Sequence, residues 1–414
     1  MPDASNLRGG GGSLPDPEGR FRPLVLLTVA LVFGFSTWFS ATAVVPQLTE
    51  VWGLSATGKA WLTISVILGF VVGALISSAL NVADRIRPQM VMLVGCVGAG
   101  AANLGLIWVS GVEVGVGLRF VTGLFLAGVY PPSFKLISTW FRQGRGMALG
   151  VLAAGIIFGN ASPHLVNAFG GIDWRSVIYS TTAMSVGGGL VAFFVRTGPF
   201  EFPRTVFDPR QIGLVFANRG VRLASIGYFG HMWELFAMAA WFLIFFGDHL
   251  EASGSQALPL AAFITWVVIA AGAAGSWVGG VVADKWGRTR FTALMLGISG
   301  VCSVGIGLLF DGPTWIIVVV GVVWGFTVVA DSAQFSAIVT EVGDQAHVGT
   351  ALTMQIAIGF TISAATIWII PLIEEAVTWT WAFALLAIGP VVGIAAMLRL
   401  KSLPEAKLIA GGRG

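Results

Sequence analysis

Long apolar stretches separated by short polar segments run along almost the whole chain. We count twelve of them, each about 18 to 26 residues long. A helix rises ~1.5 Å per residue, so such a stretch can cross the ~30 Å hydrocarbon core of a bilayer. The predicted helices are 23–46, 58–82, 88–110, 114–138, 146–168, 176–196, 222–247, 257–282, 291–310, 314–338, 349–373 and 379–400. The pattern predicts an all-α polytopic membrane protein with twelve transmembrane helices.

Composition supports a membrane protein and excludes a set of soluble domains. Of the 414 residues 56% are hydrophobic and only 10% are charged, which soluble globular domains do not show. The two cysteines, Cys96 and Cys302, both fall inside apolar stretches, so we expect neither a disulfide framework nor a metal site. The small net charge of +3 gives no reason to expect a nucleic-acid partner.

The distribution of basic residues predicts the orientation in the membrane. If the amino-terminal tail is cytoplasmic, all but three of the 23 lysine and arginine residues lie on the cytoplasmic side. The exceptions are Lys59, Arg119 and Arg175. Positive residues collect on the inner side of membrane proteins. We therefore expect a multi-pass protein of the inner (plasma) membrane with both termini in the cytoplasm.

A long polar segment divides the chain into two similar parts. The expected organisation is a disordered cytoplasmic tail (1–22), a six-helix bundle (23–196), a central cytoplasmic loop (197–221), a second six-helix bundle (222–400) and a cytoplasmic tail (401–414). Phe33-Gly34 followed by Trp38 is echoed by Phe229-Gly230 followed by Trp233, and the segment NVADRIRP is echoed by GGVVADKWGRTR. Such echoes, about 200 residues apart, indicate parallel repeats.

The second echo carries a resemblance to a known family. Gly280, Asp284, Gly287 and Arg288 resemble the cytoplasmic-loop motif of the major facilitator superfamily, with Asp84 and Arg85 as its degraded copy in the first half. The segment RFVTGLFLAG, which begins at Arg119, resembles the arginine-containing helix 4 motif, and DWRSVIY resembles the usual start of helix 6. The resemblance implies two six-helix halves that transport a solute by alternating access, with the loop motif acting as a cytoplasmic gate.

Within the superfamily, two segments resemble the branch that includes cyanate and nitrate/nitrite transporters. These segments are YPPSFKLISTWF and GMALGVLAAGIIFGNASPHL. Nitrate carriers of this branch have arginines in helices 2 and 8, whereas the corresponding stretches 61–81 and 259–283 contain none. Nitrate itself is therefore disfavoured as the solute.

Two ionisable residues stand near the middle of the seventh predicted helix. His231 and Glu234 are three residues apart and share one helical face with Tyr228. Ionisable groups cost at least ~2.5 kcal/mol each within a bilayer, so they mark candidate functional sites. An imidazole and a carboxylate can exchange protons, which makes them candidate coupling groups. The alternative is a static hydrogen-bonded pair that orders the bundle.

Further polar and aromatic candidates come from other helices. Arg119 cannot easily lose its proton, so we expect it to need an anion, either a carboxylate or the solute, or to take part in a structural ion pair. Asp331 lies in the helix equivalent to the one that carries Tyr130, and could serve in coupling or in gating. Phe35 and Trp38 could line a cavity for an organic solute or simply pack in the core.

These observations predict a secondary active transporter that moves a small organic or inorganic anion, coupled to protons. One alternative is a drug or metabolite/proton antiporter that exports its solute, and another is a membrane sensor that has the fold without transport. No catalytic motif is present, so we expect neither enzymatic activity nor a cofactor. The expected partners are a small-molecule solute, protons and the lipid bilayer, and we expect a monomer.

Overall fold

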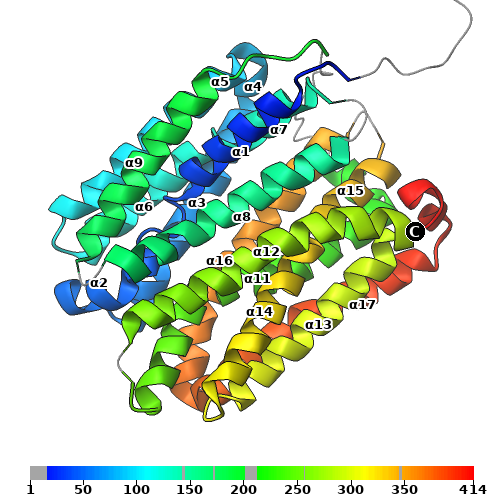
Figure 1. The fold of residues 1–414 in the computed structure, drawn as a ribbon. Coiled ribbons are helices and arrows are strands. Elements are labelled where there is room, and N and C mark those ends of the chain that lie inside the picture. Colours follow the sequence, from blue (N-terminus) through cyan, green and yellow to red (C-terminus); the bar gives the residue numbers. More distant parts are fainter. Residues whose placement is uncertain (1–15, 142–144, 171–172, 201–211, 256, 345–346) are drawn as a thin grey trace, which may run out of the picture.

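The computed structural model describes residues 16–141, 145–170, 173–200, 212–255, 257–344 and 347–414. These residues form helices joined by short turns, and no strand occurs among them. Most of the long helices lie roughly side by side along the long dimension of the molecule (Figure 1). Such a bundle suits an apolar chain, because a helix satisfies its own backbone hydrogen bonds within lipid.

The first half contains nine α-helices and two short 3₁₀ turns in its described part. Their bounds are α1 (Phe21–Phe35), η2 (Thr42–Val44), α2 (Val45–Trp52), α3 (Ala56–Ala79), α4 (Val82–Arg85), α5 (Pro88–Gly105), η3 (Leu106–Trp108), α6 (Val112–Leu126), α7 (Tyr130–Ser138), α8 (Arg145–Gly170) and α9 (Trp174–Phe193).

The second half follows a short helix after the central segment. Its elements are α10 (Ile212–Ala217), α11 (Arg219–Ala252), α12 (Leu258–Trp286), α13 (Arg288–Leu308), α14 (Thr314–Ala330), α15 (Ser332–Val342), α16 (Val348–Ala382), η5 (Phe383–Ala387), α17 (Ile388–Lys401) and η6 (Pro404–Gly411). Of the predicted central loop, residues 201–211 lie outside the described residues, as does most of the predicted amino-terminal tail.

The described helices make twelve crossings, as the sequence predicted. Ten segments are long and apolar enough to span a membrane, and the last of these, Val348–Lys401, has 54 residues. At ~1.5 Å per residue it is too long for one crossing. Thr378 interrupts it with φ 63° and ψ 175°, so it supplies two crossings. The first crossing is formed by the shorter α1 together with η2 and α2.

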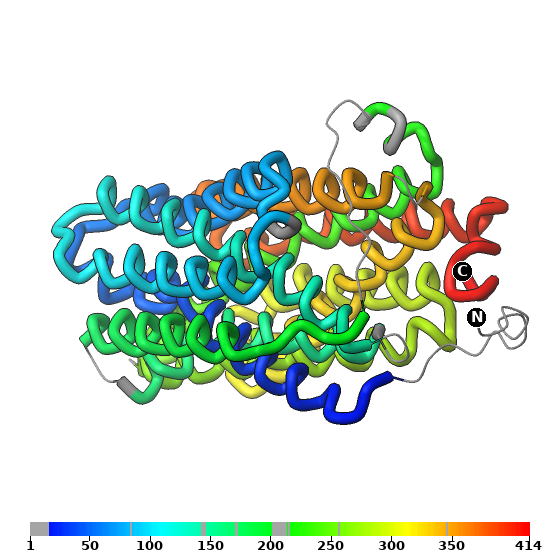
Figure 2. Tube along the Cα trace, turned by 90° about the horizontal axis from the view of Figure 1, so that it is seen from above, coloured from blue at the N-terminus to red at the C-terminus, as the bar shows by residue number. Residues whose placement is uncertain are grey.

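Both ends of the described chain lie at the same end of the bundle (Figure 2). We call this end, where α1 begins and α17 ends, the terminal face. The other end, which carries α2, is the opposite face. An even number of crossings requires this arrangement, and the structure has it.

Three predicted helices are interrupted near their centres. Where 23–46 was expected to be continuous, α1 ends at Phe35 and regular helix resumes only at Thr42. The predicted helix 114–138 divides between Leu126 and Tyr130, where Pro131 and Pro132 favour a new helix start. The predicted helix 314–338 divides at Asp331. Each interruption places backbone or side-chain polar groups at mid-depth, where they line the candidate site.

Matching glycine contacts support the predicted repeat. A Cβ at Gly69 would lie 1.9 Å from the carbonyl oxygen of Phe120, so α3 and α6 can touch only because a glycine stands there. In the second half, a Cβ at Gly325 would lie 1.9 Å from the carbonyl oxygen of Val268 and fix the contact of α12 with α14 in the same way. The two halves therefore share a packing scheme.

The halves meet mainly through two pairs of long helices. The helix α3 packs against α16, and α8 packs against α12 along much of its length. Within each half, the first helix packs on the last: α1 on α9, and α11 on α17. The polar groups described next lie on or beside α1, α6, α7, α11, α14 and α15.

Candidate functional site

The break in the first crossing is held open by Arg119. The guanidinium of this α6 residue donates to the carbonyl oxygens of Thr37 (2.8 Å), Leu62 (3.2 Å) and Trp38, and to the hydroxyl oxygen of Ser40 (3.0 Å). Thr37 and Trp38 lie in the non-helical segment, so their carbonyl oxygens are free for a donor from another helix. A planar group with five donors can satisfy several such acceptors at once.

The expected anion beside Arg119 is replaced by neutral oxygen atoms. The side chain is fully buried, and no carboxylate of the described residues lies within ion-pair distance of it. Ser40 extends the network because its hydroxyl lies 2.5 Å from Oδ1 of Asn103 in α5. The first half therefore holds a buried positive charge that no acid of the described residues compensates.

An aromatic cluster joins the two halves beside this network. We define it as Trp38, Phe39, Phe70, Phe236 and Phe360. Ring centroids lie 5.7 Å apart for Trp38 and Phe236, 5.9 Å for Trp38 and Phe360, and 5.1 Å for Phe70 and Phe360. Each of these pairs has one ring from each half.

Two predicted aromatic candidates lie at the edge of this cluster. Phe35 stacks on Trp38 with centroids 6.0 Å apart. Tyr130, at the start of α7, lies 6.4 Å from Phe70 and 4.7 Å from Phe134. The helix breaks at residues 36–41 and 127–129 thus bring Trp38 and Tyr130 to the same aromatic region.

His231 pairs with Asp331 across two helices of the second half. Its Nδ1 lies 2.9 Å from Oδ1 of the aspartate, and both side chains are 1% exposed. Asp331 occupies the break between α14 and α15, where the start of a helix favours a negative charge. Tyr228 lies one turn before His231, with ring centroids 5.9 Å apart. These three predicted residues therefore form one group.

Glu234 belongs to a separate network. Its carboxylate accepts hydrogen bonds from the indole N–H of Trp324 at 2.6 Å and from the hydroxyl of Ser299 at 2.9 Å. The sequence suggested that Glu234 and His231 could bond one another, but residues three apart on a helix diverge by about 60°. Each side chain therefore reaches a different partner, and the predicted static pair does not form.

The two halves brace their first helices in related ways. In the first half, Arg119 donates to the carbonyl oxygen of Trp38. In the second, Trp324 donates to Glu234, which lies 196 residues after Trp38, the same separation as that between Phe33 and Phe229. The first crossing is broken here and meets a cation, whereas α11 is unbroken and offers a carboxylate to a neutral donor.

The predicted gate motif of the second half surrounds Arg288 at the terminal face. Its guanidinium lies 2.8 Å from Asp284 and 3.0 Å from Glu341, and donates to Gln334 at 2.6 Å. Gly287 has φ +102°, a conformation that other residues adopt only with strain. The motif therefore ties the end of α12 and the start of α13 to α15.

The end of the chain covers this motif. Ala410 donates its backbone N–H to Glu341 at 3.1 Å, and Arg413 donates to the carbonyl oxygen of Asp284 at 3.0 Å. Ile409 is fully buried beneath them. The predicted tail 401–414 thus contains an ordered 3₁₀ segment that packs on the gate.

Two parts of the gate prediction turn out differently. A Cβ at Gly280 would meet no atom within 4 Å, whereas one at Gly279 would lie 2.0 Å from the carbonyl oxygen of Ala330. The close contact of this motif with α14 is therefore made by Gly279, the neighbour of Gly280. In the degraded copy of the motif, Arg85 is exposed, and the side chain of Asp84 lies outside the described residues.

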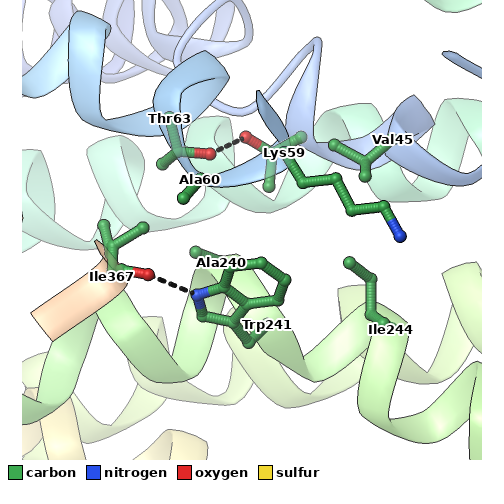
Figure 3. A pocket seen from close by; sticks show the side chains of 9 residues that line it. Val45, Lys59, Ala60, Thr63, Ala240, Trp241, Ile244 and Ile367 are labelled. Carbon is green, nitrogen blue, oxygen red and sulfur yellow. Dashed lines mark hydrogen bonds between the residues drawn. The ribbon is translucent and has the colours of Figure 1, made fainter. Parts of the chain in front are cut away.

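The halves also touch at the opposite face, around a small pocket (Figure 3). Lys59 of α3 extends along the boundary toward Val45 and Ile244, and Trp241 donates to the carbonyl oxygen of Ile367 at 3.0 Å. The pocket volume of about 10 Å³ holds one water molecule at most.

Lys59 faces acidic residues of the other half. It interacts electrostatically with the carboxyl groups of Asp248 in α11 and Glu374 in α16. Asp248 also accepts a hydrogen bond from the indole of Trp379 at 2.7 Å. A cation of one half therefore lies near two carboxylates of the other at the opposite face, without a direct ion pair to either.

Sequence reasoning missed several partners in these networks. Ser299, Trp324 and Glu341 were not selected, because a serine, a tryptophan or a glutamate near a helix end is common in membrane helices. The repeat did not indicate Trp324 either, because it lies 205 residues after Arg119 whereas Glu234 lies 196 residues after Trp38. The contacts of Glu341 depend on the fold of the chain end, so no sequence pattern indicated them.

The fold and the site define a class of protein. Two repeat-related helical bundles, broken helices at mid-depth and buried ionisable groups near their boundary are the architecture of secondary transporters. The family model described as Major Facilitator Superfamily matches residues 26–365. The chain therefore belongs to the major facilitator superfamily, and it is a multi-pass membrane protein of a transporter family.

Comparison with individual proteins supports this membership. The chain is 23% identical over 345 residues to an "MFS-type transporter" of Gibberella moniliformis, covering 81% of this chain and 79% of the relative. It is 26% identical over 258 residues to the "Probable sulfoacetate transporter SauU" of Cupriavidus necator, covering 56% of this chain and 58% of that relative.

A solved structure shows the same fold. The crystal structure of a D-xylose-proton symporter superposes with a TM-score of 0.70 at 17% identity, covering 94% of this chain and 98% of that chain.

Proposed function

We propose that the protein transports a small organic or inorganic anion by alternating access, coupled to protons. One observation carries the anion: Arg119 is buried without an acid partner and bonds to the backbone of Trp38. The indole N–H of Trp38 is itself buried and has no acceptor among the described residues. A positive potential and a free donor at the boundary of the halves favour a solute that is negative and rich in acceptors.

The Glu234 network is suited to gaining and losing a proton. The hydroxyl of Ser299 lies 2.9 Å from Glu234 and 3.1 Å from the carbonyl oxygen of Leu296. It can donate to the ionised carboxylate, or accept from the protonated one while donating to Leu296. Both states thus keep their hydrogen bonds. We assign proton coupling to Glu234, with the His231–Asp331 pair as a second candidate for coupling.

The orientation and assembly belong to the same proposal. The terminal face is the cytoplasmic one, because the basic residues gather there, and the protein acts as a monomer in the plasma membrane. Residues 23–196 and 222–400 act as the two moving halves, and the solute is moved without covalent chemistry or a cofactor.

Transport by the reconstituted protein tests coupling. An imposed pH gradient should drive accumulation of an organic anion in proteoliposomes. Glu234→Gln keeps a polar side chain but cannot ionise, so it should abolish accumulation and leave exchange of solute across the membrane intact. Glu375→Gln, an exposed acid at the opposite face, is the matched control and should accumulate solute normally. Full accumulation by Glu234→Gln would exclude Glu234 as the coupling group.

The aromatic cluster supports one other function, export of an amphiphilic drug or metabolite in exchange for protons. Aromatic faces attract organic cations, but the uncompensated charge of Arg119 opposes them. Proton-driven exchange of a hydrophobic cation, without any uptake of anions, would favour this export function over the one that we propose.

A further inference from the structure

His164 in α8 is a buried polar side chain that no protein group satisfies. It is fully buried, and neither ring nitrogen has a hydrogen-bond partner among the described residues. By contrast, His249 is bonded at both nitrogens, to the carbonyl oxygen of Phe310 and to the hydroxyl of Thr314. An unsatisfied buried polar group costs about 1–3 kcal/mol. Such a group is explained if it bonds to a ligand.

His164 lies at the boundary between the halves. Its ring centroid is 6.5 Å from that of Phe39, which in turn lies 6.3 Å from Phe236 of the other half. Asn160 precedes it by one turn on the same face of α8, and its Oδ1 is also buried without a partner. Two polar side chains of one helix thus stand beside the aromatic cluster.

The same cluster also carries the donor described above, which ring contacts through Phe39 and Phe236 connect to His164. Trp38, next to Phe39 in the chain, has an unpartnered indole N–H, and its carbonyl oxygen binds Arg119. The cluster therefore has an anion-favouring group at Trp38 and uncharged hydrogen-bonding groups at His164 and Asn160. Flat aromatic surfaces lie between them.

Alternating access must separate the rings that cross the boundary. Contacts of Trp38 and Phe70 with rings of the other half are broken when the halves move apart. Aromatic pairs are worth about 0.5–1.5 kcal/mol each beyond the area that they bury. A flat aromatic solute replaces these contacts with contacts of the same kind, whereas a small aliphatic or inorganic ion does not.

We propose that this site binds aromatic carboxylates that carry a second polar substituent on the ring. The carboxylate accepts from the indole N–H of Trp38, the ring lies within the aromatic cluster, and the substituent bonds to His164 and Asn160. This assignment rests on the proposed function, since it requires the solute to be an anion.

The test compares three acids in proteoliposomes that contain the full chain. These are 4-hydroxybenzoate, benzoate and acetate. We expect half-saturation by 4-hydroxybenzoate at a concentration about tenfold below that of benzoate, as one additional buried hydrogen bond provides, and weaker binding of acetate. Ligand-induced shifts in the melting temperature of the purified protein should rank the three acids in the same order of affinity.

Substitution of His164 tests the assignment of the residue. His164→Phe should bring the ratio of the two half-saturation concentrations close to one, and His164→Gln, which keeps a donor and an acceptor, should restore part of it. Phe158→Leu is the control on α8, because Phe158 is 40% exposed and its ring contacts Trp266, which is not part of the cluster, and it should keep the tenfold ratio. Melting curves show whether each variant is folded.

The outcomes separate the two proposals. Failure to transport or bind any organic or inorganic anion overturns the proposed function and this inference with it. Uptake of acetate or inorganic anions without a preference for aromatic acids overturns the inference alone. An unchanged ratio in folded His164→Phe removes His164 from the site.

Discussion

At the scale of single residues, Arg119 has an unusual pair of roles. It is buried like a structural group, since three oxygen atoms of the break at residues 36–41 and one of α3 receive its hydrogen bonds. It also leaves a positive charge uncompensated in the middle of the first half. The two roles can be separated, because one depends on the shape of the guanidinium and the other depends on charge.

Arg119→Lys should lower stability and preserve much of the anion affinity. An ammonium group has three donors and cannot reach all four acceptors, and each buried acceptor left without a donor costs about 1–3 kcal/mol. Arg119→Gln should be destabilised similarly and also lose anion affinity by tenfold or more. Melting curves and half-saturation of anion uptake measure the two effects. Arg175→Lys, exposed at the opposite face, is the control for both.

Equal anion affinity in folded Arg119→Lys and Arg119→Gln would contradict the electrostatic role. The sequence did identify this residue, because an arginine in a helix that is otherwise apolar is costly. It could not identify the partners. Backbone carbonyl groups become available as acceptors for side chains only where a helix is interrupted. The composition of residues 36–41 does not indicate such an interruption.

At the scale of elements, the covered gate depends on one glycine conformation. Gly287 joins α12 to α13 at φ +102°, and a Cβ there would lie 2.1 Å from the carbonyl oxygen of Arg413. Glycine is therefore required at residue 287 for two reasons: it allows the backbone conformation of the joint, and it leaves room for the chain end that covers the joint. Gly280, seven residues earlier, needs it for neither reason.

Gly287→Ala should displace the end of the chain, whereas Gly280→Ala should not. We expect a cost of about 1–3 kcal/mol from the strained conformation, together with the clash at Arg413. Proteolysis should then remove residues 404–414 more rapidly than in the unmodified protein. Gly280→Ala lies within a helix with free space around it and should be neutral or slightly stabilising. Equal protection of the chain end in both variants would show that it does not depend on Gly287.

The elements illustrate where sequence reasoning succeeds. Apolar stretches of membrane-spanning length are an unambiguous signal, so all twelve crossings were found. The interruptions at residues 36–41 and at Asp331 were not predicted, because an apolar segment looks the same whether or not its helix is continuous. Only Pro131 and Pro132 offered a local reason for a break.

At the scale of the whole molecule, the halves are held together by different chemistry at different depths. Aromatic rings join them at the centre, and at the opposite face Lys59 meets Asp248 and Glu374. The charged contact is partly exposed, so it is worth at most about 1 kcal/mol and weakens with salt. It can adjust the balance between conformations without locking one of them.

Lys59→Gln should increase the population open at the opposite face by up to about fivefold, which corresponds to 1 kcal/mol. Spin labels at the exposed positions Val51 and Val377, one in each half, report this opening as longer distances. The same change should appear in the unmodified protein at high salt. Arg175→Gln is the control on this face. An unaltered distance distribution in Lys59→Gln would exclude the contact as a gate.

The sequence predicted the division into halves but not how they touch. Repeats are visible along one chain, since the same packing solution uses similar residues twice. Contacts between the halves join different positions of the two repeats, such as Trp38 with Phe236 and Phe70 with Phe360, so the repeat pattern does not reveal them. The alternative that we considered, a hydrogen bond between Glu234 and His231, is not formed for a related reason: their spacing on one helix does not show which partners the neighbouring helices provide.

The glycine contacts described above have a mechanical consequence. Where Gly69 meets Phe120 and Gly325 meets Val268, backbone rests directly on backbone, with no flexible side chain between them to absorb a displacement. Each half should therefore move as a rigid body. Two probes placed on α3 and α6 would keep a constant separation throughout the transport cycle. Their distance would provide an internal reference for distance changes measured between the halves.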